Sequence, residues 1–565
     1  MLSAALPPFA IFFIGALFVM VTRGWLRMLI LLALPFIGFY NLLGFDHGSY
    51  WQTSLFDYTL TLMRVDKLSL VFGYLFHLAS FLGIVFSLHA RHDTMQQTTG
   101  ILYAGSAMGA IFAGDLITLF VFWELLAVSS VFLIWARRTE RAYRSGMRYL
   151  IVQIASGVIL LAGILVHIHN TGDVAFNFIG LTSLSGGLIL LAIGIKSCFP
   201  LLHNWLSDAY PEATPSGTVF LSAFTTKVAV YALARGYPGT EILVYVGATM
   251  AMFPIFFAVI ENDLRRVLAY SLINQVGFMV CGIGIGTEMA VNGAVAHAFN
   301  DVVFKGLLFM TMGAVLYRTG EIRGSHLGGL YKSMPWTTTF CIVGAASISA
   351  FPLFSGFVSK SMVMVAALNE GHDIVWLLLL FASAGVFHHA GIKIPFFAFF
   401  AHDSGIRCKE APWNMLLAMG IAAAICIFNG SYPAVLYSLM PFEVDYIPYD
   451  TTHVLAQMQL LFFSAMAFVW LNLKGLYPPE LPSINIDAEW LYRKLLPASA
   501  RTFLTAFVPI DQHIRAGFMK KFDRTMDEVF RHHGPHGVLA RTWAIGSTVL
   551  WVALLLVLYL IVYYI

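Results

Sequence analysis

Charged residues are scarce in this chain. They make up 11% of its 565 residues, whereas 59% of the residues are hydrophobic. An ordinary soluble domain carries about 25% charged residues, so the composition excludes a soluble globule and indicates an integral membrane protein. The net charge is only +3. This value does not favour a nucleic-acid partner, and we expect none.

Cysteine is scarce as well, and its spacing indicates no chemistry. The five cysteines form no CxxC pair and no zinc or iron–sulfur spacing. The sequence also lacks a motif for a redox cofactor. We therefore expect small buried thiols, no metal site, no cofactor in this chain and no catalytic residues.

Long apolar runs fill most of the sequence. Runs of about 20 residues are long enough to cross a bilayer, and we count about 14 to 16 of them. The first run has no basic stretch before it and no cleavage site after it, so we interpret it as a retained span and not as a signal peptide. The sequence predicts an all-α polytopic membrane protein.

Lysine and arginine concentrate in alternate loops. Clusters such as 137–148 and 265–266 fall on one side of the predicted bundle, whereas the opposite loops, such as 169–180 and 431–453, are nearly free of them. By the positive-inside rule, both termini are predicted outside.

Residues 475–541 mix apolar and basic residues at helical spacing before the final span at 542–565. They are predicted to form an amphipathic segment along the membrane or a partner subunit. A small cytoplasmic cap is the alternative.

Ionisable residues also occur inside the apolar runs. Such residues are costly in a bilayer, usually face the bundle interior and mark ion or proton pathways. We predict a proton pathway from one set and auxiliary roles for a second. The pathway set is Glu124, Lys196, Lys227, His297, Asp301, Lys305 and Lys393, and the auxiliary set is His388, His389 and Lys360. The alternative, structural ion pairs that lock helices together, is less favoured because the charges are spread over five helices.

The spacing of three of these residues favours a relay. His297, Asp301 and Lys305 are four residues apart, which places them on one face of a helix over about 12 Å. His389 and Lys393 repeat this spacing. Burial favours a neutral lysine, whereas a nearby carboxylate favours the ammonium form. A lysine balanced between the two can load and release a proton.

Two of the lysines lie near prolines in similar stretches. Lys196 in "GIKSCFP" precedes Pro200, and Lys393 in "GIKIPFF" precedes Pro395. Proline removes a backbone hydrogen bond and breaks or kinks a helix. Broken helices at corresponding positions in two halves indicate the binding site of a transporter, so we predict a helix break beside each lysine.

Several long motifs then resemble a known family. "FPLLHNWLSDAYPEATPSGTVFLSAFTTKVAVYALAR", "HAFNDVVFKGLLFMTMGAVLY" and "SAFPLFSGFVSK" resemble the antiporter-like membrane subunits of respiratory complex I (NADH-quinone oxidoreductase), membrane-bound hydrogenases and Mrp-type Na⁺/H⁺ antiporters. The end of the resembling region looks most like D-type Mrp subunits. The resemblance covers roughly residues 60–430.

The resemblance implies two inverted repeats, each with a broken helix. It implies that Glu124 pairs with Lys196 in the first broken helix, that Lys227 comes next, and that Lys393 is the terminal site in the second. His297 and Lys305 would form the central relay. The expected organisation is N-terminal helices at 1–95, repeats at 96–236 and 237–403, C-terminal helices at 404–474, the segment 475–541 and the last span at 542–565.

Asp301 departs from the family, in which many members have a histidine at this position. We expect its carboxylate to hold Lys305 protonated more firmly than an imidazole would.

The function implied is proton translocation, with Na⁺ exchange as a variant, by one subunit of a multisubunit complex, in a bacterial inner membrane. The alternatives are a proton-conducting partner that energises another reaction, such as inorganic-carbon uptake, and a stand-alone secondary transporter. Any enzyme name would come from an NADH-quinone oxidoreductase-like or hydrogenase-like complex.

Overall fold

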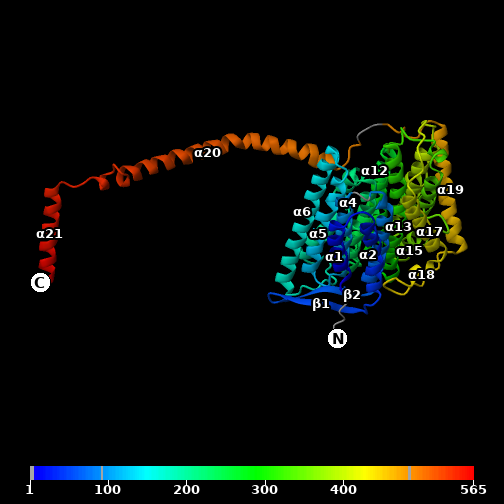
Figure 1. Cartoon of the computed structure of the whole chain (residues 1–565), viewed down its shortest axis with the longest axis horizontal. Coiled ribbons are helices and arrows are strands. Elements are labelled where there is room, and N and C mark those ends of the chain that lie inside the picture. Colours follow the sequence, from blue (N-terminus) through cyan, green and yellow to red (C-terminus); the bar gives the residue numbers. More distant parts are fainter. Residues whose placement is uncertain (1–5, 91–92, 482–484, 565) are drawn as a thin grey trace. The chain divides into compact units, whose positions relative to one another are not determined.

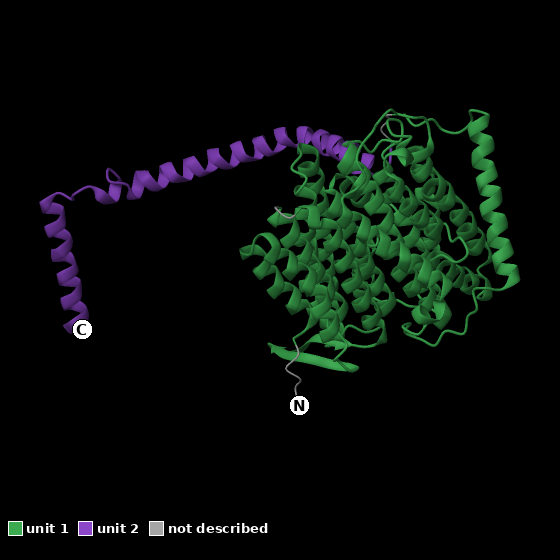
Figure 2. Ribbon diagram, turned by 45° about the vertical axis from the view of Figure 1, so that its right-hand side comes forward, with its two compact units in different colours: residues 1–485 green, residues 486–565 purple. Residues whose placement is uncertain are grey.

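A computed structural model describes residues 6–90, 93–481 and 485–564 of the chain. The chain forms two compact units, residues 1–485 and residues 486–565 (Figure 2). The first unit is a bundle of helices, and the only sheet among the described residues is one two-stranded hairpin. The predicted all-α class is therefore confirmed.

The N-terminal part of the first unit comprises three helices and the hairpin. Its elements are α1 (Pro8–Val21), α2 (Gly24–Leu42), β1 (Gly48–Leu55), β2 (Tyr58–Val65), α3 (Lys67–Ser87) and η1 (Leu88–Ala90). The antiparallel hairpin lies across one end of the bundle (Figure 1). Asp66 fixes the start of α3 through a capping box with Ser69, which satisfies two backbone N–H groups at the helix end.

Two sets of five helical segments follow. The first set contains α4 (Thr94–Phe112), α5 (Leu116–Trp135), α6 (Glu140–Thr171), α7 (Leu184–Lys196) continued by α8 (Asn204–Ala209) and η2 (Tyr210–Glu212), and α9 (Pro215–Ala223) continued by α10 (Thr225–Gly236). The second set contains α11 (Ile242–Ile260), α12 (Leu264–Ile285), α13 (Glu288–Thr319), η3 (Leu330–Lys332) with α14 (Pro335–Ile348) continued by α15 (Ser355–Asn369), and α16 (Asp373–Val386) continued by η4 (Phe387–Lys393) and η5 (Phe396–Phe400).

The two sets correspond in their details. The third helix of each, α6 and α13, has 32 residues, and the fourth segment of each is interrupted. Because five is an odd number, two such sets that each cross the membrane five times would run in opposite senses. The pair of inverted repeats expected at 96–236 and 237–403 stays a prediction.

The first helix break lies where the sequence predicts it. The chain leaves α7 at Lys196, and Cys198 and Leu201 adopt positive φ angles of 66° and 69° before α8 begins. Residues other than glycine rarely adopt such angles, so the tight turn is maintained by its surroundings.

The second break is not beside Lys393, where we predicted it. Residues 373–400 stay helical, and π-helical turns on both sides of Pro395 carry the helix past the proline. Wider turns of this kind relieve a mid-helix proline that lacks its N–H group. The interruption instead separates α14 from α15, with Ala350 at φ 57° and Leu353 at φ 70°.

Twelve helices of the described chain are long and apolar enough to cross a membrane, and α1 and α7 are shorter apolar helices. After the second set, the first unit ends with α17 (Trp413–Ser431), α18 (Pro433–Tyr437) and α19 (Thr451–Leu473). The second unit contains η6 (Leu491–Leu495), α20 (Leu496–His533), η7 (Val538–Ala540) and α21 (Ile545–Tyr564).

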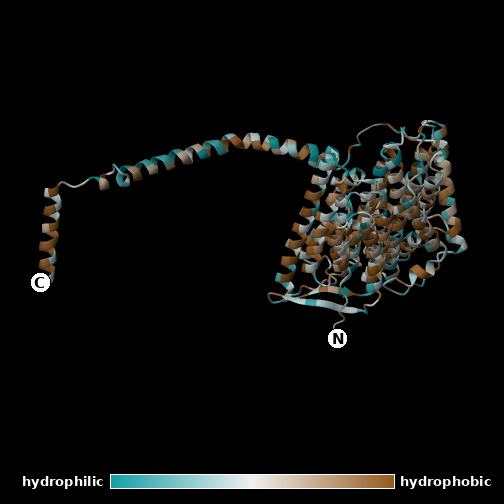
Figure 3. Cartoon of the chain, in the orientation of Figure 1, coloured by the Kyte–Doolittle hydropathy of each residue, from teal (hydrophilic) through white to brown (hydrophobic). Residues whose placement is uncertain are grey.

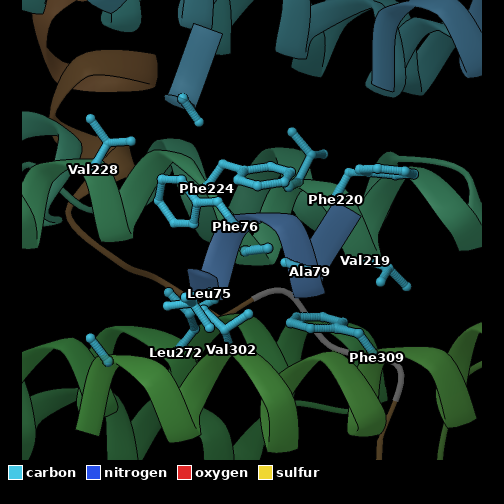
Figure 4. Close-up of a cluster of buried hydrophobic side chains, with 14 of the residues drawn as sticks. Leu75, Phe76, Ala79, Val219, Phe220, Phe224, Val228, Leu272, Val302 and Phe309 are labelled. Carbon is cyan, nitrogen blue, oxygen red and sulfur yellow. The ribbon is translucent and has the colours of Figure 1, made fainter. Parts of the chain in front are cut away.

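Helix α3 lies at the centre of the apolar core. Figure 4 shows Leu75, Phe76 and Ala79 of α3 between α9–α10 on one side and α12–α13 on the other. Phe76 packs edge-on against Phe224 at a centroid distance of 5.1 Å. This packing joins the two repeats through a helix that belongs to neither.

The second unit contains the amphipathic segment that the sequence predicts. Helix α20 has 38 residues, a length of about 57 Å, and its apolar and polar residues alternate along it, whereas α21 is almost wholly apolar (Figure 3). Within the unit, the side chains of α20 are exposed. An exposed helix with one apolar side is typical of a segment that lies on a membrane or a partner.

Candidate functional site: a row of buried charges

The first charged group of the row joins α5 to α7. The Lys196 ammonium nitrogen Nζ donates to the Trp123 carbonyl at 2.6 Å and lies 4.4 Å from the centroid of the Trp123 ring. The charges of Glu124 and Lys196 interact. Glu124 Oε1 is buried and has no hydrogen-bond partner among the described residues. The expected pairing of these two side chains is therefore an electrostatic one.

Helix α6 sets the position of this pair. Ser156 Oγ accepts from the Trp123 indole at 3.1 Å and donates to the Ala192 carbonyl at 2.8 Å, so it links α5 to α7. The next residue, Gly157, faces Glu124 so closely that an added Cβ would lie 1.3 Å from Oε1. The glutamate fits only because residue 157 has no side chain.

A buried ion pair connects the two repeats. Lys227 Nζ of α10 lies 2.5 Å from Asp301 Oδ2 of α13, and both side chains are fully buried. Lys227 also donates to the Ser222 carbonyl at 3.3 Å, next to the helix interruption at Phe224. A buried pair is held firmly because removing one partner would leave an uncompensated charge.

This contact adds a partner that we did not expect for Asp301. The sequence predicts that Asp301 holds Lys305 protonated, and the direct ion pair of Asp301 is with Lys227. Lys305 Nζ donates to Ser271 Oγ of α12 at 2.8 Å, although the charge of Asp301 still acts on it. The spacing of four residues places Asp301 and Lys305 on neighbouring turns, and the packing of α10 and α12 decides which partner each one reaches.

His297 occupies the other end of the same helix face. Its Nδ1 lies 3.0 Å from Ser359 Oγ of α15, and its Nε2 lies 3.1 Å from Gln275 Oε1 of α12. The ring is fully buried. Among the described residues, no hydrogen bond joins His297 directly to Asp301 or Lys305, so a proton moving along this face needs water or a rearrangement between them.

Lys360 lies next to the second helix break. Its Nζ donates to the Ile348 carbonyl at the end of α14, at 2.9 Å, and lies 5.2 Å from the centroid of the Phe278 ring. Lys196 has the same kind of surroundings at the first break, with one carbonyl and one aromatic ring. The structure therefore places Lys360, predicted as auxiliary, where Lys393 was expected.

Lys393 instead lies at the end of α11. Its Nζ donates to the carbonyls of Val259 at 2.6 Å and Glu261 at 2.7 Å, and it forms an ion pair of 2.8 Å with Glu480. A cation is favourable at the carbonyl end of a helix. Burial raises the pKa of Glu480 above its ordinary value, and the ammonium of Lys393 opposes this shift.

The two neighbouring histidines have different surroundings. His388 stacks on Tyr477 at a centroid distance of 5.4 Å. His389 is fully buried, and the charges of both Lys305 and Lys393 act on it. His389 therefore interacts electrostatically both with Lys393 and with Lys305 of α13.

Ion pairs fasten α8 and η2, the helical turns that follow the first break. Arg148 donates to both Asp208 oxygens at 2.8 and 3.0 Å, and Arg141 lies 2.6 Å from Glu212. Fully buried Arg265 of α12 donates to the carbonyl of Pro211 at 3.0 Å. These contacts form a structural clamp at the basic end of the bundle, away from the buried row.

The sequence did not reveal the neutral partners of the row. Trp123, Ser271, Gln275 and Ser359 are ordinary residues of membrane helices, and only the packing shows their roles. Lys360 does carry a signal in the sequence, because Pro352 precedes it in an apolar run as Pro200 follows Lys196.

Comparison with known proteins finds a matching family. The family described as "NADH:quinone oxidoreductase/Mrp antiporter, TM" matches residues 113–387, which contain every charged residue of the row from Glu124 to Lys360. Over these residues the chain is similar to the antiporter-like membrane subunits of this family. The match also contains both helix breaks.

Individual relatives of this antiporter-like protein come from several complexes. It is 30% identical to the D-type subunit of a Na⁺/H⁺ antiporter from Alkalihalophilus pseudofirmus over 50% of this chain and 62% of the relative. It is 28% identical to hydrogenase-4 component B from Escherichia coli over 66% of this chain and 62% of the relative. The chain thus spans less than two thirds of the length of these relatives.

Solved structures share the fold of the antiporter-like protein. A chain of an archaeal membrane-bound sulfane sulfur reductase superposes with a TM-score of 0.72 at 20% identity, over 98% of this chain and 99% of that one. A chain of the Mrp complex from Dietzia sp. gives 0.66 at 20% identity, over 81% of this chain and 95% of that one.

Proposed function

We propose that the chain moves protons across the membrane along its row of buried charges, as one subunit of a larger complex. The observation that carries the proposal is the fully buried Lys227–Asp301 pair, which joins the last helix of the first repeat to the third helix of the second. A charge pair at this junction is costly to bury. A pathway that has to cross between the repeats gives a reason for it.

The row would work by successive proton transfers. Glu124 favours the charged form of Lys196, and Lys227 and Asp301 pass the proton from one repeat to the other. Lys305 and His297 continue the row on α13, and the charges of Lys227, Lys305 and Lys360 all act on His297. Each gain or loss of a proton thus changes the energy of its neighbours. His389 gives the row a branch toward Lys393.

Partner subunits would supply the energy. Relatives carry names of Na⁺/H⁺ antiporter subunits and of a hydrogenase component, so we propose coupling either to cation exchange or to redox chemistry in other subunits. Sodium is the second ion to test beside the proton. Mass spectrometry of the subunits that co-purify with this chain distinguishes the two forms of coupling.

Substitution at the first site tests the proposal. Glu124→Gln and Lys196→Ala are expected to abolish coupled proton movement into vesicles that contain the whole complex, measured with a pH-sensitive dye. Ser464→Ala, in α19 and outside the row, is the matched control and should retain the parent rate. Native gel electrophoresis should show an assembled complex for all three. Full transport activity in both Glu124→Gln and Lys196→Ala would overturn the proposal.

We propose a bacterial inner membrane as the location, with both termini on the outer face. The support is the concentration of arginine in alternate loops. Protease protection of tags fused to the two ends, in right-side-out and inside-out vesicles, tests this topology. Cleavage of both tags only in inside-out vesicles would contradict it.

A further inference from the structure

A cavity lies beside the second helix break, next to Lys360, and extends away from the other charged residues of the row. It has a volume of about 90 Å³ and lies between α15, α16 and α19. Its lining includes Lys360 and Ser361 of α15, Trp376 of α16, and His453, Ala456 and Gln457 of α19. The cavity therefore connects a fully buried lysine of the row to a helix outside both repeats.

The cavity can hold water. A water molecule occupies about 30 Å³ in the liquid and needs polar partners to remain in a cavity. Four of the residues that line the cavity carry polar groups of this kind, namely Lys360, Ser361, His453 and Gln457. These groups come from two facing helices, so a short chain of water can connect them.

The other end of the cavity reaches the start of α19. His453 lies in the first turn of this helix, its backbone N–H donates to the N-cap Asp450 at 2.6 Å, and its side chain is 25% exposed. Its Nδ1 lies 3.6 Å from Asp450 Oδ2 and 3.5 Å from the Tyr446 hydroxyl. The loop before this helix belongs to the face that is nearly free of lysine and arginine.

Helix α19 and the loop before it are held against the break by two hydrogen bonds. Gln457 Nε2 donates to the Ser349 carbonyl at 3.1 Å, and the Tyr449 hydroxyl accepts from the Leu353 N–H at 3.1 Å. Both backbone groups belong to the non-helical turn between α14 and α15. The break, the lysine and the first turns of α19 thus form one connected structure.

We infer that this cavity is the passage by which protons move between Lys360 and the membrane face on which α19 begins, with His453 as the group that exchanges them with bulk water. The inference rests on the proposed function. In the outward direction an N–H bond of the Lys360 ammonium breaks as a cavity water takes the proton. A ring nitrogen of His453 then accepts it, and the imidazolium releases it to solvent. The step requires no electron transfer and no co-reactant.

Two substitutions test the passage in the whole complex. Ala456→Leu places a larger side chain in the cavity, and His453→Ala removes the exchanging group. Each is expected to lower the initial rate of proton movement at least severalfold without loss of assembly. Ala467→Leu, at an exposed position of the same helix, is the matched control and should retain the parent rate.

The outcome separates this inference from the proposed function. If Ala456→Leu and His453→Ala keep the parent rate while Glu124→Gln abolishes transport, the passage lies elsewhere and the proposed function stands. If Glu124→Gln also keeps the parent rate, the proposed function itself fails.

Thiol labelling gives a second readout for variants that assemble poorly. The residue introduced by Ala456→Cys should react with a small charged, membrane-impermeant thiol reagent added to right-side-out vesicles. Ala467→Cys and the parent chain should react slowly or not at all. An Ala456→Cys chain that reacts no faster than these two would overturn the inference.

Discussion

Substitution of Gly157 by alanine is the sharpest test of how the protein positions Glu124. An added Cβ would lie 1.3 Å from Glu124 Oε1 and 2.5 Å from Cδ. A carbon and an oxygen normally approach no closer than about 3.3 Å, so the carboxylate oxygen has to move by about 2 Å. The helix itself gains from the change, because alanine is favoured over glycine in a helix by roughly 1 kcal/mol.

The expected result is a loss of transport in a folded protein. A displacement of about 1 Å at a reacting group can cost about a hundredfold in rate, so Gly157→Ala should lower proton movement by about ten- to a hundredfold. The assay is dye-reported proton movement into vesicles with the assembled complex. Thermal unfolding in detergent should show that the chain remains at least as stable as the parent.

The control is another glycine-to-alanine change in the same repeat. Gly187 lies on α7, the helix of Lys196, and an added Cβ there meets nothing within 4 Å. Gly187→Ala should therefore transport at the parent rate. Equal rates for Gly157→Ala and the parent would refute the idea that the carboxylate position matters. A double variant with Glu124→Gln should lose no more activity than Glu124→Gln alone.

Three further predictions concern stability, measured by thermal unfolding in detergent. Asp301→Asn leaves the buried Lys227 charge without its counter-ion and should lower the free energy of unfolding by about 3–5 kcal/mol. Adding Lys227→Met to the same chain should recover part of this stability. No recovery would contradict the pairing. Hydrogen bonds from cationic neighbours, chiefly Arg407, hold the pKa of Asp403 below its ordinary value. This stabilisation is present above about pH 4, the ordinary range of an unfolded aspartate, and is lost as the pH falls through the lower folded pKa. Asp403→Asn should therefore lower the melting temperature at pH 6 and converge with the parent in acid, and a difference that does not depend on pH would contradict it. Gly277→Ala would place a Cβ 2.5 Å from a backbone nitrogen of α11 and should cost about 1–3 kcal/mol, whereas an unchanged melting temperature would show that α11 and α12 can separate freely.

The positions of the buried charges could be predicted from the sequence, but their partners could not. A lysine such as Lys227 in an apolar run has to face the bundle interior, because lipid offers its ammonium no partner. Its partner Asp301 lies 74 residues away, and the distance along the chain says nothing about which helices pack together. The sequence therefore predicted which charged residues are buried and that Asp301 acts on Lys305, but it did not reveal the direct ion pair of Asp301 with Lys227.

The positions of the helix breaks could likewise be predicted only in part from the sequence. Pro200 and Pro395 both predict an interruption, and only the first occurs, because π-helical turns carry the chain past the second. Whether a proline breaks a helix or widens it depends on the packing around it. The second break contains Pro352, which lies outside the two Gly-Ile-Lys stretches.

The buried row contains more amines than carboxylates. Lys196, Lys227, Lys305 and Lys360 face only Glu124 and Asp301 as acidic members of the row. In a medium of low dielectric constant, such a surplus cannot all be charged at once. On the proposed function, the interior would hold a number of protons close to the number of its carboxylates, so that a proton entering at one end would favour the departure of another at the far end. The unequal composition of the row would then couple its two ends electrostatically, without movement of a helix.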